Sequence, residues 1–243
     1  MSRSWRTGRD QKLGRVSQTT IIAGVFARGG SKGVPNKNLR VVGGQSLVAR
    51  AVFQARATKH VERVLCSTDS QLIADEARRH GAEVPWLRPT ELAGDTSREW
   101  DSWCHMVRWL HEQGDDPTYL MAVPCVAPLR TVDDLNSCAD LAVESGADVI
   151  MAVSDAHKNP WFNMVTIDDK SKQVRLVNEP AQRIYNRQAA PPVYDVSTVA
   201  FIIKCEYLLR ATSIYDGETR AVILPKSHCV DIDTEEDIEY AEF

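Results

Sequence analysis

The sequence predicts an α/β protein built around a mostly parallel β-sheet. Short apolar runs rich in β-branched residues alternate with segments whose apolar residues recur at helical spacing. The first such unit is a strand beginning at Ile21 followed by a helix near 47–55. The second is a strand at 61–69 followed by a helix near 72–77 that ends before Gly81. Repeated strand–helix units of this length are typical of a parallel sheet, which binds ligands at the carboxyl ends of its strands.

The bulk composition narrows the class of protein. With 243 residues, 43% hydrophobic and 26% charged, the chain can form one large domain with a substantial core. A net charge of −4 argues against general nucleic-acid binding, and no apolar run is long enough to span a membrane. Six cysteines without a C-x-x-C pair, and the lack of a secretory signal, favour a reduced cytoplasmic protein. Residues 1–19 are basic and aperiodic, which predicts a disordered tail; an arm for nucleic acid or membrane is the alternative.

The later elements follow the same alternation, with one interruption. We expect a helix introduced by a capping box of Thr96 and Glu99, then a strand at 119–123, a helix from Thr131 and a strand at 147–154. Between about 155 and 195 the rhythm lapses, and a hairpin through 168–171 is expected there. Strands at 194–202 and 221–225 and a terminal helix complete the chain.

A basic, glycine-rich loop follows the first strand. Gly29, Gly30 and Gly33 let backbone N–H groups approach an anion closely, and Arg28, Lys32 and Lys37 would complement phosphate charge. The loop matches neither the P-loop nor the dinucleotide-binding pattern. Phosphate binding is the functional interpretation, and a surface turn with solvated charges is the alternative.

Two aspartates near the C-terminus form a second candidate site. In an extended segment Asp231 and Asp233 project to the same side, and two carboxylates beside phosphate oxygens suit Mg²⁺. The alternative is that Asp233 and Thr234 only cap the last helix.

These motifs together resemble a known family. The run from Ala27 to Asn38 is similar to the Ala-Arg-Gly-Gly-Ser-Lys-Gly-x-Pro-x-Lys-Asn signature of the acylneuraminate cytidylyltransferases, the CMP-sialic acid synthetases. Arg88, the run 128–131, Arg187 and the run 231–233 also match. The resemblance implies a three-layer, Rossmann-like (GT-A-like) nucleotidyltransferase domain over 20–243, in which an arm at about 155–195 builds a homodimer. It also implies transfer of CMP from CTP to an acidic sugar with release of pyrophosphate.

The resemblance assigns roles residue by residue. The nucleotide would be held by Ala27, Arg28, Gly29, Gly30, Ser31, Lys32, Asn38, Arg88, Asp95, Thr96 and Ser97. Catalysis would fall to Arg28, Lys32, Lys37, Asp231 and Asp233, with Mg²⁺, or Mn²⁺, on the two aspartates. The acceptor would contact Pro124, Arg187, Gln188, Ser197 and Phe201.

Departures from the family pattern fall on the acceptor side. Residues 124–127 are apolar where family members carry polar side chains, and Ser197 and Phe201 replace an Asn and a Tyr. A phosphonate acceptor is therefore an alternative to a sialic acid-like sugar acid. Two further alternatives are a nucleotide-sugar glycosyltransferase and a non-catalytic nucleotide-binding protein. No general base is assigned; His157, Lys158 and Asp195 are the candidates considered.

Overall fold

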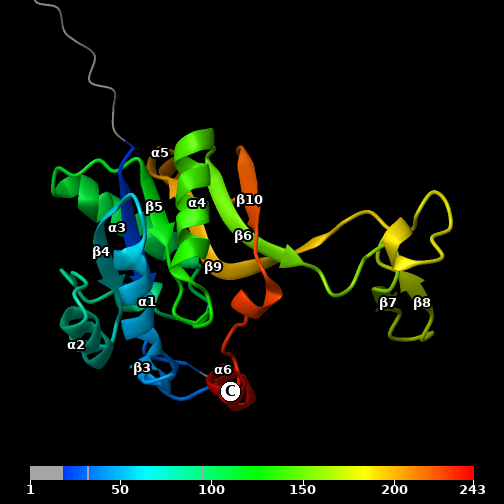
Figure 1. The fold of residues 1–243 in the computed structure, drawn as a ribbon, viewed down its shortest axis with the longest axis horizontal. Helices are drawn as coiled ribbons and strands as arrows, with labels where there is room; N and C mark the ends of the chain where they lie inside the picture. The colour runs from blue at the N-terminus through cyan, green and yellow to red at the C-terminus, as the bar shows by residue number, and fades with distance from the viewer. Residues whose placement is uncertain (1–18, 32, 95) are drawn as a thin grey trace, which may run out of the picture.

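The computed structural model describes residues 19–31, 33–94 and 96–243, and its centre is a six-stranded sheet (Figure 1). The strand order is β10-β6-β9-β5-β1-β4. The strands are β1 (Ile21–Phe26), β4 (Val61–Ser67), β5 (Tyr119–Ala122), β6 (Val149–Asp155), β9 (Tyr194–Lys204) and β10 (Thr219–Ile223). The helices are α1 (Leu47–Ala57), α2 (Gln71–Arg79), α3 (Glu99–Glu112), α4 (Val132–Ser145), α5 (Cys205–Arg210) and α6 (Glu235–Glu242).

The sheet is mixed but mostly parallel, as the sequence predicts. β1 pairs in parallel with β4 and β5, and β10 pairs in parallel with β6. The one strand that runs against its neighbours is β9, which lies between β5 and β6. The carboxyl ends of β1, β4 and β5 therefore open at the same edge of the sheet, where a ligand site is expected.

Two helical layers cover the sheet, which makes the domain three-layered. Buried residues of α1, α2, α4 and α6 join one hydrophobic cluster, whereas those of α3 and α5 join another on the opposite face. The apolar stripe of α3 is core as predicted: Trp103, Val107 and Leu110 are buried. Gly81 follows α2 with a φ of +91°, the left-handed conformation expected of a glycine after a helix.

One local prediction is wrong. α3 begins at Glu99 with Arg98 as its N-cap residue, and no side chain caps it, so the expected Thr96–Glu99 capping box does not form. Capping boxes are present instead at α4, between Thr131 and Asp134, and at α6, between Thr234 and Asp237. The side chain of Glu99 is thus available for another contact.

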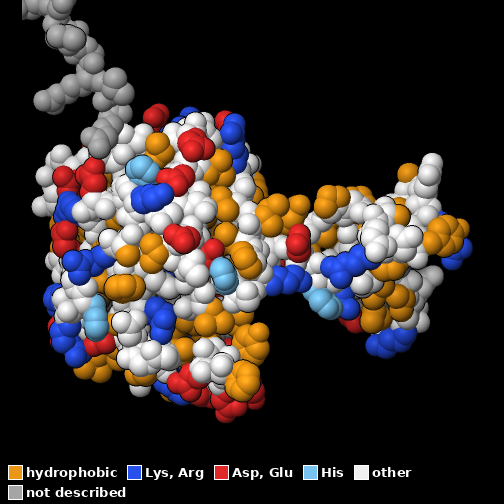
Figure 2. All heavy atoms as spheres, in the orientation of Figure 1, with side chains coloured by type: hydrophobic (Ala, Val, Ile, Leu, Met, Phe, Trp, Pro, Cys, Tyr) orange, Lys and Arg blue, Asp and Glu red, His pale blue; other side chains and the backbone are white. Residues whose placement is uncertain are grey.

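The segment 156–193 projects away from the sheet, between β6 and β9 (Figure 1). It contains the expected hairpin, formed by β7 (Val165–Ile167) and β8 (Val174–Leu176), and the short 3₁₀-helix η3 (Arg187–Ala189). The Asp168 carboxylate closes the hairpin turn by accepting hydrogen bonds from Ser171 and from the N–H of Lys170. Hydrophobic side chains gather on this arm (Figure 2), and Ile167, Val174 and Tyr185 are exposed.

The remaining elements are short. They are the two-stranded ribbon β2 (Val41–Val42) and β3 (Gln45–Ser46), and the 3₁₀-helices η1 (Lys37–Leu39), η2 (Thr90–Leu92) and η4 (Lys226–His228). The predicted basic tail, up to residue 18, lies outside the described residues. No helix in the described parts of the chain has the length and apolar character needed to cross a membrane.

Candidate active site

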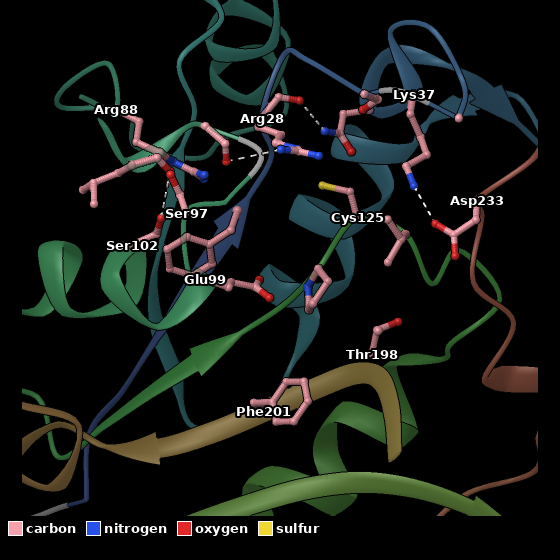
Figure 3. Close-up of a pocket in the computed structure, with 18 residues that line it drawn as sticks. Arg28, Lys37, Arg88, Ser97, Glu99, Ser102, Cys125, Thr198, Phe201 and Asp233 are labelled. Atoms are coloured by element: carbon pink, nitrogen blue, oxygen red, sulfur yellow. Dashed lines mark hydrogen bonds and ion pairs between the residues drawn. The ribbon is translucent and has the colours of Figure 1, made fainter. Parts of the chain in front are cut away.

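A cavity of about 470 Å³ lies at the carboxyl ends of β1, β4 and β5 (Figure 3). It collects side chains from segments far apart in the sequence. The predicted site residues that line it are Arg28, Ser31, Lys37, Asn38, Arg88, Ser97, Pro124, Phe201 and Asp233. The glycine loop, the Arg88 segment, the end of β5, the middle of β9 and the late acidic segment therefore share one site.

The glycine loop is held in place by neighbouring polar groups. The N–H of Gly29 donates to Asp69 Oδ1 at 2.8 Å, across the parallel pair β1 and β4. The buried amide of Asn38 donates to the Arg28 carbonyl at 2.9 Å, and Arg28 Nη1 lies 3.4 Å from the Gly94 carbonyl oxygen. The loop thus presents Arg28 and Ser31 to the cavity from a fixed backbone.

The acidic segment, residues 231–233, lies beside the glycine loop at the same end of the cavity. Lys37 Nζ donates to the Ile232 carbonyl at 2.5 Å and to Asp233 Oδ1 at 3.0 Å. The Asp233 side chain is 75% exposed, whereas Asp231 is half-buried and accepts a hydrogen bond from the Thr198 hydroxyl. Burial, reinforced by the nearby charge of Asp233, raises the pKa of Asp231. Lys37 balances this local negative charge.

The donor set at this end fits a hard divalent cation that is also bound by phosphate. No group of three or more His, Cys, Asp or Glu side chains suited to a metal occurs among the described residues, so protein donors alone form no closed cage. Asp231 and Asp233 offer two carboxylates, and Mg²⁺ characteristically takes one or two of these together with phosphate oxygens and water. The chemistry of the pair is therefore compatible with the predicted magnesium.

The Arg88 segment forms the other end of the cavity. The buried guanidinium of Arg88 donates to the hydroxyl and the carbonyl of Ser67, and it lies over the ring of Phe26 at 5.9 Å. Burial lowers the pKa of Arg88. The Ser97 hydroxyl donates to the Glu91 carbonyl at 2.7 Å, which closes the turn before α3. This end is compact, polar and partly aromatic, which suits a nucleobase.

The wall at the acceptor side is mainly apolar and is supported from behind. Pro124, Cys125 and Val126 line it, and burial raises the pKa of the Cys125 thiol to about 12, so this cysteine is not a thiolate nucleophile. Behind the wall, the buried Arg130 donates to the carbonyls of Pro124 and Val199. Arg130 therefore ties the end of β5 to β9.

In β9 the structure places Thr198, rather than the predicted Ser197, in the cavity wall. Ser197 is buried, and its hydroxyl accepts a hydrogen bond from the N–H of Val199. The register against β6 shifts between Met151 and Val153, which changes the alternation of side chains along β9. Thr198 and Phe201 consequently face the cavity although they are three residues apart.

Other predicted residues lie away from the cavity of their own chain. Arg187 and Gln188 are on the arm, where the Arg187 guanidinium donates to the Ala156 carbonyl. The general-base candidates His157, Lys158 and Asp195 are exposed near the base of the arm and do not line the cavity either. A role for any of these side chains in the site would require a neighbouring protomer.

Several residues of the predicted nucleotide site support the cavity without lining it. Ala27 is fully buried, and its N–H donates to the Ser67 carbonyl at 3.1 Å, so its side chain packs in the core and does not line the cavity. Gly29, Gly30 and Thr96 are also absent from the lining. Lys32 and Asp95 lie outside the described residues.

Sequence reasoning missed several residues that the fold brings to the cavity. Glu99, Ser102 and Thr198 line it, as do Leu92 and Val126. Ser102 follows Glu99 by three residues, so the two lie on one face of α3. That spacing, on a helix expected at the ligand-binding edge, was the signal that could have identified Glu99 and Ser102.

Fold and site together define a nucleotide-binding α/β transferase, and comparison with known proteins identifies its class as nucleotidyltransferase. The family model "Cytidylyltransferase" matches residues 22–242, and the chain belongs to this family. It is 31% identical to a CMP-N,N'-diacetyllegionaminic acid synthase of Campylobacter jejuni, over 92% of this chain and 94% of the relative. It is 30% identical to post-translational flagellin modification protein B of Campylobacter coli, with the same coverage.

A solved structure supports the fold assignment. The CMP:2-keto-3-deoxy-manno-octonic acid synthetase complexed with CTP superimposes with a TM-score of 0.66 at 14% identity, covering 92% of this chain and 97% of that one. This likeness confirms the predicted fold class, whereas the family model and the relatives confirm the predicted family.

Proposed function

We propose that this enzyme transfers CMP from CTP to a sialic acid-like 2-keto-3-deoxy sugar acid and releases pyrophosphate. One observation carries the proposal: a single cavity joins a compact base-sized end at Arg88 to an end with Arg28, Lys37 and Asp233. The named relatives, which include a diacetyllegionaminic acid synthase, support an acceptor of this chemical class.

The proposed reaction is a direct substitution at phosphorus. A hydroxyl oxygen of the acceptor forms a bond to the α-phosphorus of CTP, the bond from that phosphorus to the bridging oxygen breaks, and pyrophosphate leaves with the electron pair. The hydroxyl proton passes to solvent. Charge builds on the phosphate oxygens, so catalysis requires orientation and positive charge more than a protein nucleophile.

This chain's residues supply those requirements. Arg28 and Ser31 would bind the phosphates, and Lys37 would move from Asp233 toward the leaving pyrophosphate. Asp231 and Asp233 would hold Mg²⁺, which supplies positive charge to the phosphate oxygens when it is bound. Pro124, Thr198 and Phe201 would form the acceptor wall.

The apolar acceptor wall supports a phosphonate as the alternative acceptor. Pro124, Cys125 and Val126 offer few side-chain hydrogen bonds to sugar hydroxyls, and a phosphonate needs fewer such contacts. An assay of pyrophosphate release distinguishes sugar acids from phosphonates by the acceptor that is consumed.

The arm is proposed to complete the site in a homodimer. Its exposed apolar residues form a surface of the kind that a second copy of this chain would cover, and they include Val165, Ile167, Val174 and Val177. Arg187 and Gln188 would then reach the partner's acceptor end. Six unpaired thiols, five of them buried, support a reducing cytoplasmic location.

The test measures pyrophosphate release with CTP, Mg²⁺ and a panel of N,N'-diacetyllegionaminic acid, N-acetylneuraminic acid and a phosphonate, and identifies the CMP adduct by mass spectrometry. Release that depends on CTP and on one acid is expected. Asp233→Asn should lose most of the activity, whereas Asp169→Asn, on the exposed hairpin turn, removes the same charge and should not. Absence of CTP-dependent release with every acceptor would contradict the proposal.

A further inference from the structure

Glu99 places a carboxylate in a cavity whose proposed ligands are anionic. It is the first residue of α3, and its side chain points into the middle of the cavity, between the Arg88 end and the Lys37–Asp233 end (Figure 3). Two acidic residues among the described ones line the cavity, and the other, Asp233, is already paired with Lys37. The position of Glu99 therefore needs a separate explanation.

The protein itself leaves this carboxylate without a matched donor. Among the described residues no cation lies within ion-pair distance of it, and the nearby Arg88 guanidinium is committed to Ser67. The indole N–H of Trp103, one turn along α3, is close enough to favour the charged carboxylate, but its geometry is not that of a hydrogen bond. Desolvation by the surrounding protein raises the pKa of Glu99, although the residue as a whole is exposed to the open cavity. A donor from a ligand would satisfy it.

The chemistry of the ligand limits which donor can meet Glu99. An ionised carboxylate only accepts hydrogen bonds and repels phosphate and acid groups. A bound nucleotide with its base at Arg88 and its phosphates at Lys37 must place its ribose between them, where Glu99 points. The rings of Phe26 and Phe201 also line the cavity and offer apolar faces for the sugar. Two carboxylate oxygens match the two adjacent ribose hydroxyls.

We propose that Glu99 accepts hydrogen bonds from the 2′- and 3′-hydroxyls of the bound nucleotide and so selects ribonucleotide over deoxyribonucleotide. This specificity role rests on the proposed function, because it assumes CTP in this cavity. Glu99 is exposed to the open cavity, and a bound nucleotide would cover it. A deoxynucleotide would then leave a covered carboxylate oxygen without its donor, and a site built to hydrogen-bond a hydroxyl discriminates strongly against a ligand that lacks it.

The experiment compares CTP, 2′-deoxy-CTP and 3′-deoxy-CTP by calorimetric binding with Mg²⁺ and no acceptor, and by kcat/KM with the acceptor. For a hydrogen bond to a charged group, the wild type should prefer CTP over each deoxy analogue by roughly tenfold to a hundredfold. Glu99→Ala and Glu99→Gln should weaken the binding of CTP more than that of either deoxy analogue, because each analogue keeps only one of the two hydroxyls, so the preference for CTP shrinks. Glu112→Gln, an exposed residue at the other end of α3, is the matched control and should keep the full preference.

Distinct outcomes overturn the proposal. Equal losses for CTP and both analogues, or a change confined to the acceptor KM, would show that Glu99 does not read the ribose. If both variants fail to fold, wild-type affinities that are the same for all three nucleotides would overturn it without any variant. Failure of the wild type to bind CTP at all would instead refute the proposed function.

Discussion

Gly33 sits where the glycine loop meets the acidic segment, and replacing it with alanine should damage the site. A Cβ built on Gly33 would lie less than 3.0 Å from the carbonyl oxygen of Asp233 and 3.4 Å from its carbonyl carbon. Both are backbone atoms, so no side-chain rotation relieves the overlap. Restoring ordinary van der Waals separation requires the two segments to part by roughly 1 Å.

That displacement sets the expected magnitudes. A misplacement of about 1 Å between catalytic groups can lower the rate by about a hundredfold, so we expect a loss of this order in kcat/KM for Gly33→Ala. The overlap should also lower the free energy of unfolding by about 1–3 kcal/mol, which corresponds to a fall in Tm of about 2–12 °C for a chain of this size.

The assay is pyrophosphate release, combined with thermal unfolding followed by circular dichroism. Gly30→Ala is the matched control for stability, because a Cβ at Gly30 meets no atom within 4 Å. Its Tm should stay close to that of the wild type. If Gly33→Ala unfolds at the wild-type temperature and retains wild-type kcat/KM, the close approach of the two segments does not matter, and our account of this end of the cavity is wrong.

Three further predictions concern the cavity support, its acids and the arm. Arg130→Met should lower the free energy of unfolding, measured in urea, by about 3 kcal/mol or more, because it removes the hydrogen-bond donor of the Pro124 and Val199 carbonyls. Arg108→Ala, on the exposed face of α3, should change the free energy of unfolding little. Asp231→Asn should raise Tm in metal-free buffer at pH 8 but not at acid pH. The folded chain binds the Asp231 proton more tightly than the unfolded chain does, so the stability that this group contributes is lost as pH rises through its raised pKa. The neutral Asn avoids that loss. Activity should fall in the same variant, and an unchanged Tm at both pH values would contradict the assignment. Arg187→Ala should raise the acceptor KM without altering CTP affinity. Arg175→Ala, elsewhere on the arm, is the control. A loss of CTP binding in Arg187→Ala, or an equal rise in acceptor KM in Arg175→Ala, would refute the arm's proposed role.

The parts of the fold and site that depend on local pattern could be predicted from the sequence. Apolar periodicity identified the main strands and helices, because each buries one face against a neighbour. That the ends of the first two strands lie at one edge could also be predicted, because the carboxyl ends of adjacent parallel strands share an edge. The 2.8 Å hydrogen bond from the Gly29 N–H to Asp69 is formed at that edge.

The parts that depend on long-range register could not be predicted in this way. Thr198 faces the cavity because of an irregularity in the pairing of β9 with β6, and no local feature of 194–202 reveals it. Glu99 was assigned to a cap because Thr96 precedes it by three residues, but the helix starts two residues later than that pattern requires. Arg130 supports the cavity through carbonyls that are 6 and 69 residues away in sequence, which only the folded chain brings together.

The arm's hairpin turn and strand β9 should differ in how readily they accept inserted residues during evolution. The strand begins at the base of the arm with Tyr194 and continues to the cavity wall at Thr198 and Phe201. Lengthening the hairpin turn at 168–171 would alter only contacts made within the arm. One residue inserted between Tyr194 and Thr198 would instead exchange the inward and outward faces of the following strand residues and turn both side chains away from the cavity. Homologues that diversify should therefore vary in length at the tip of the arm and keep a fixed count of residues along this strand.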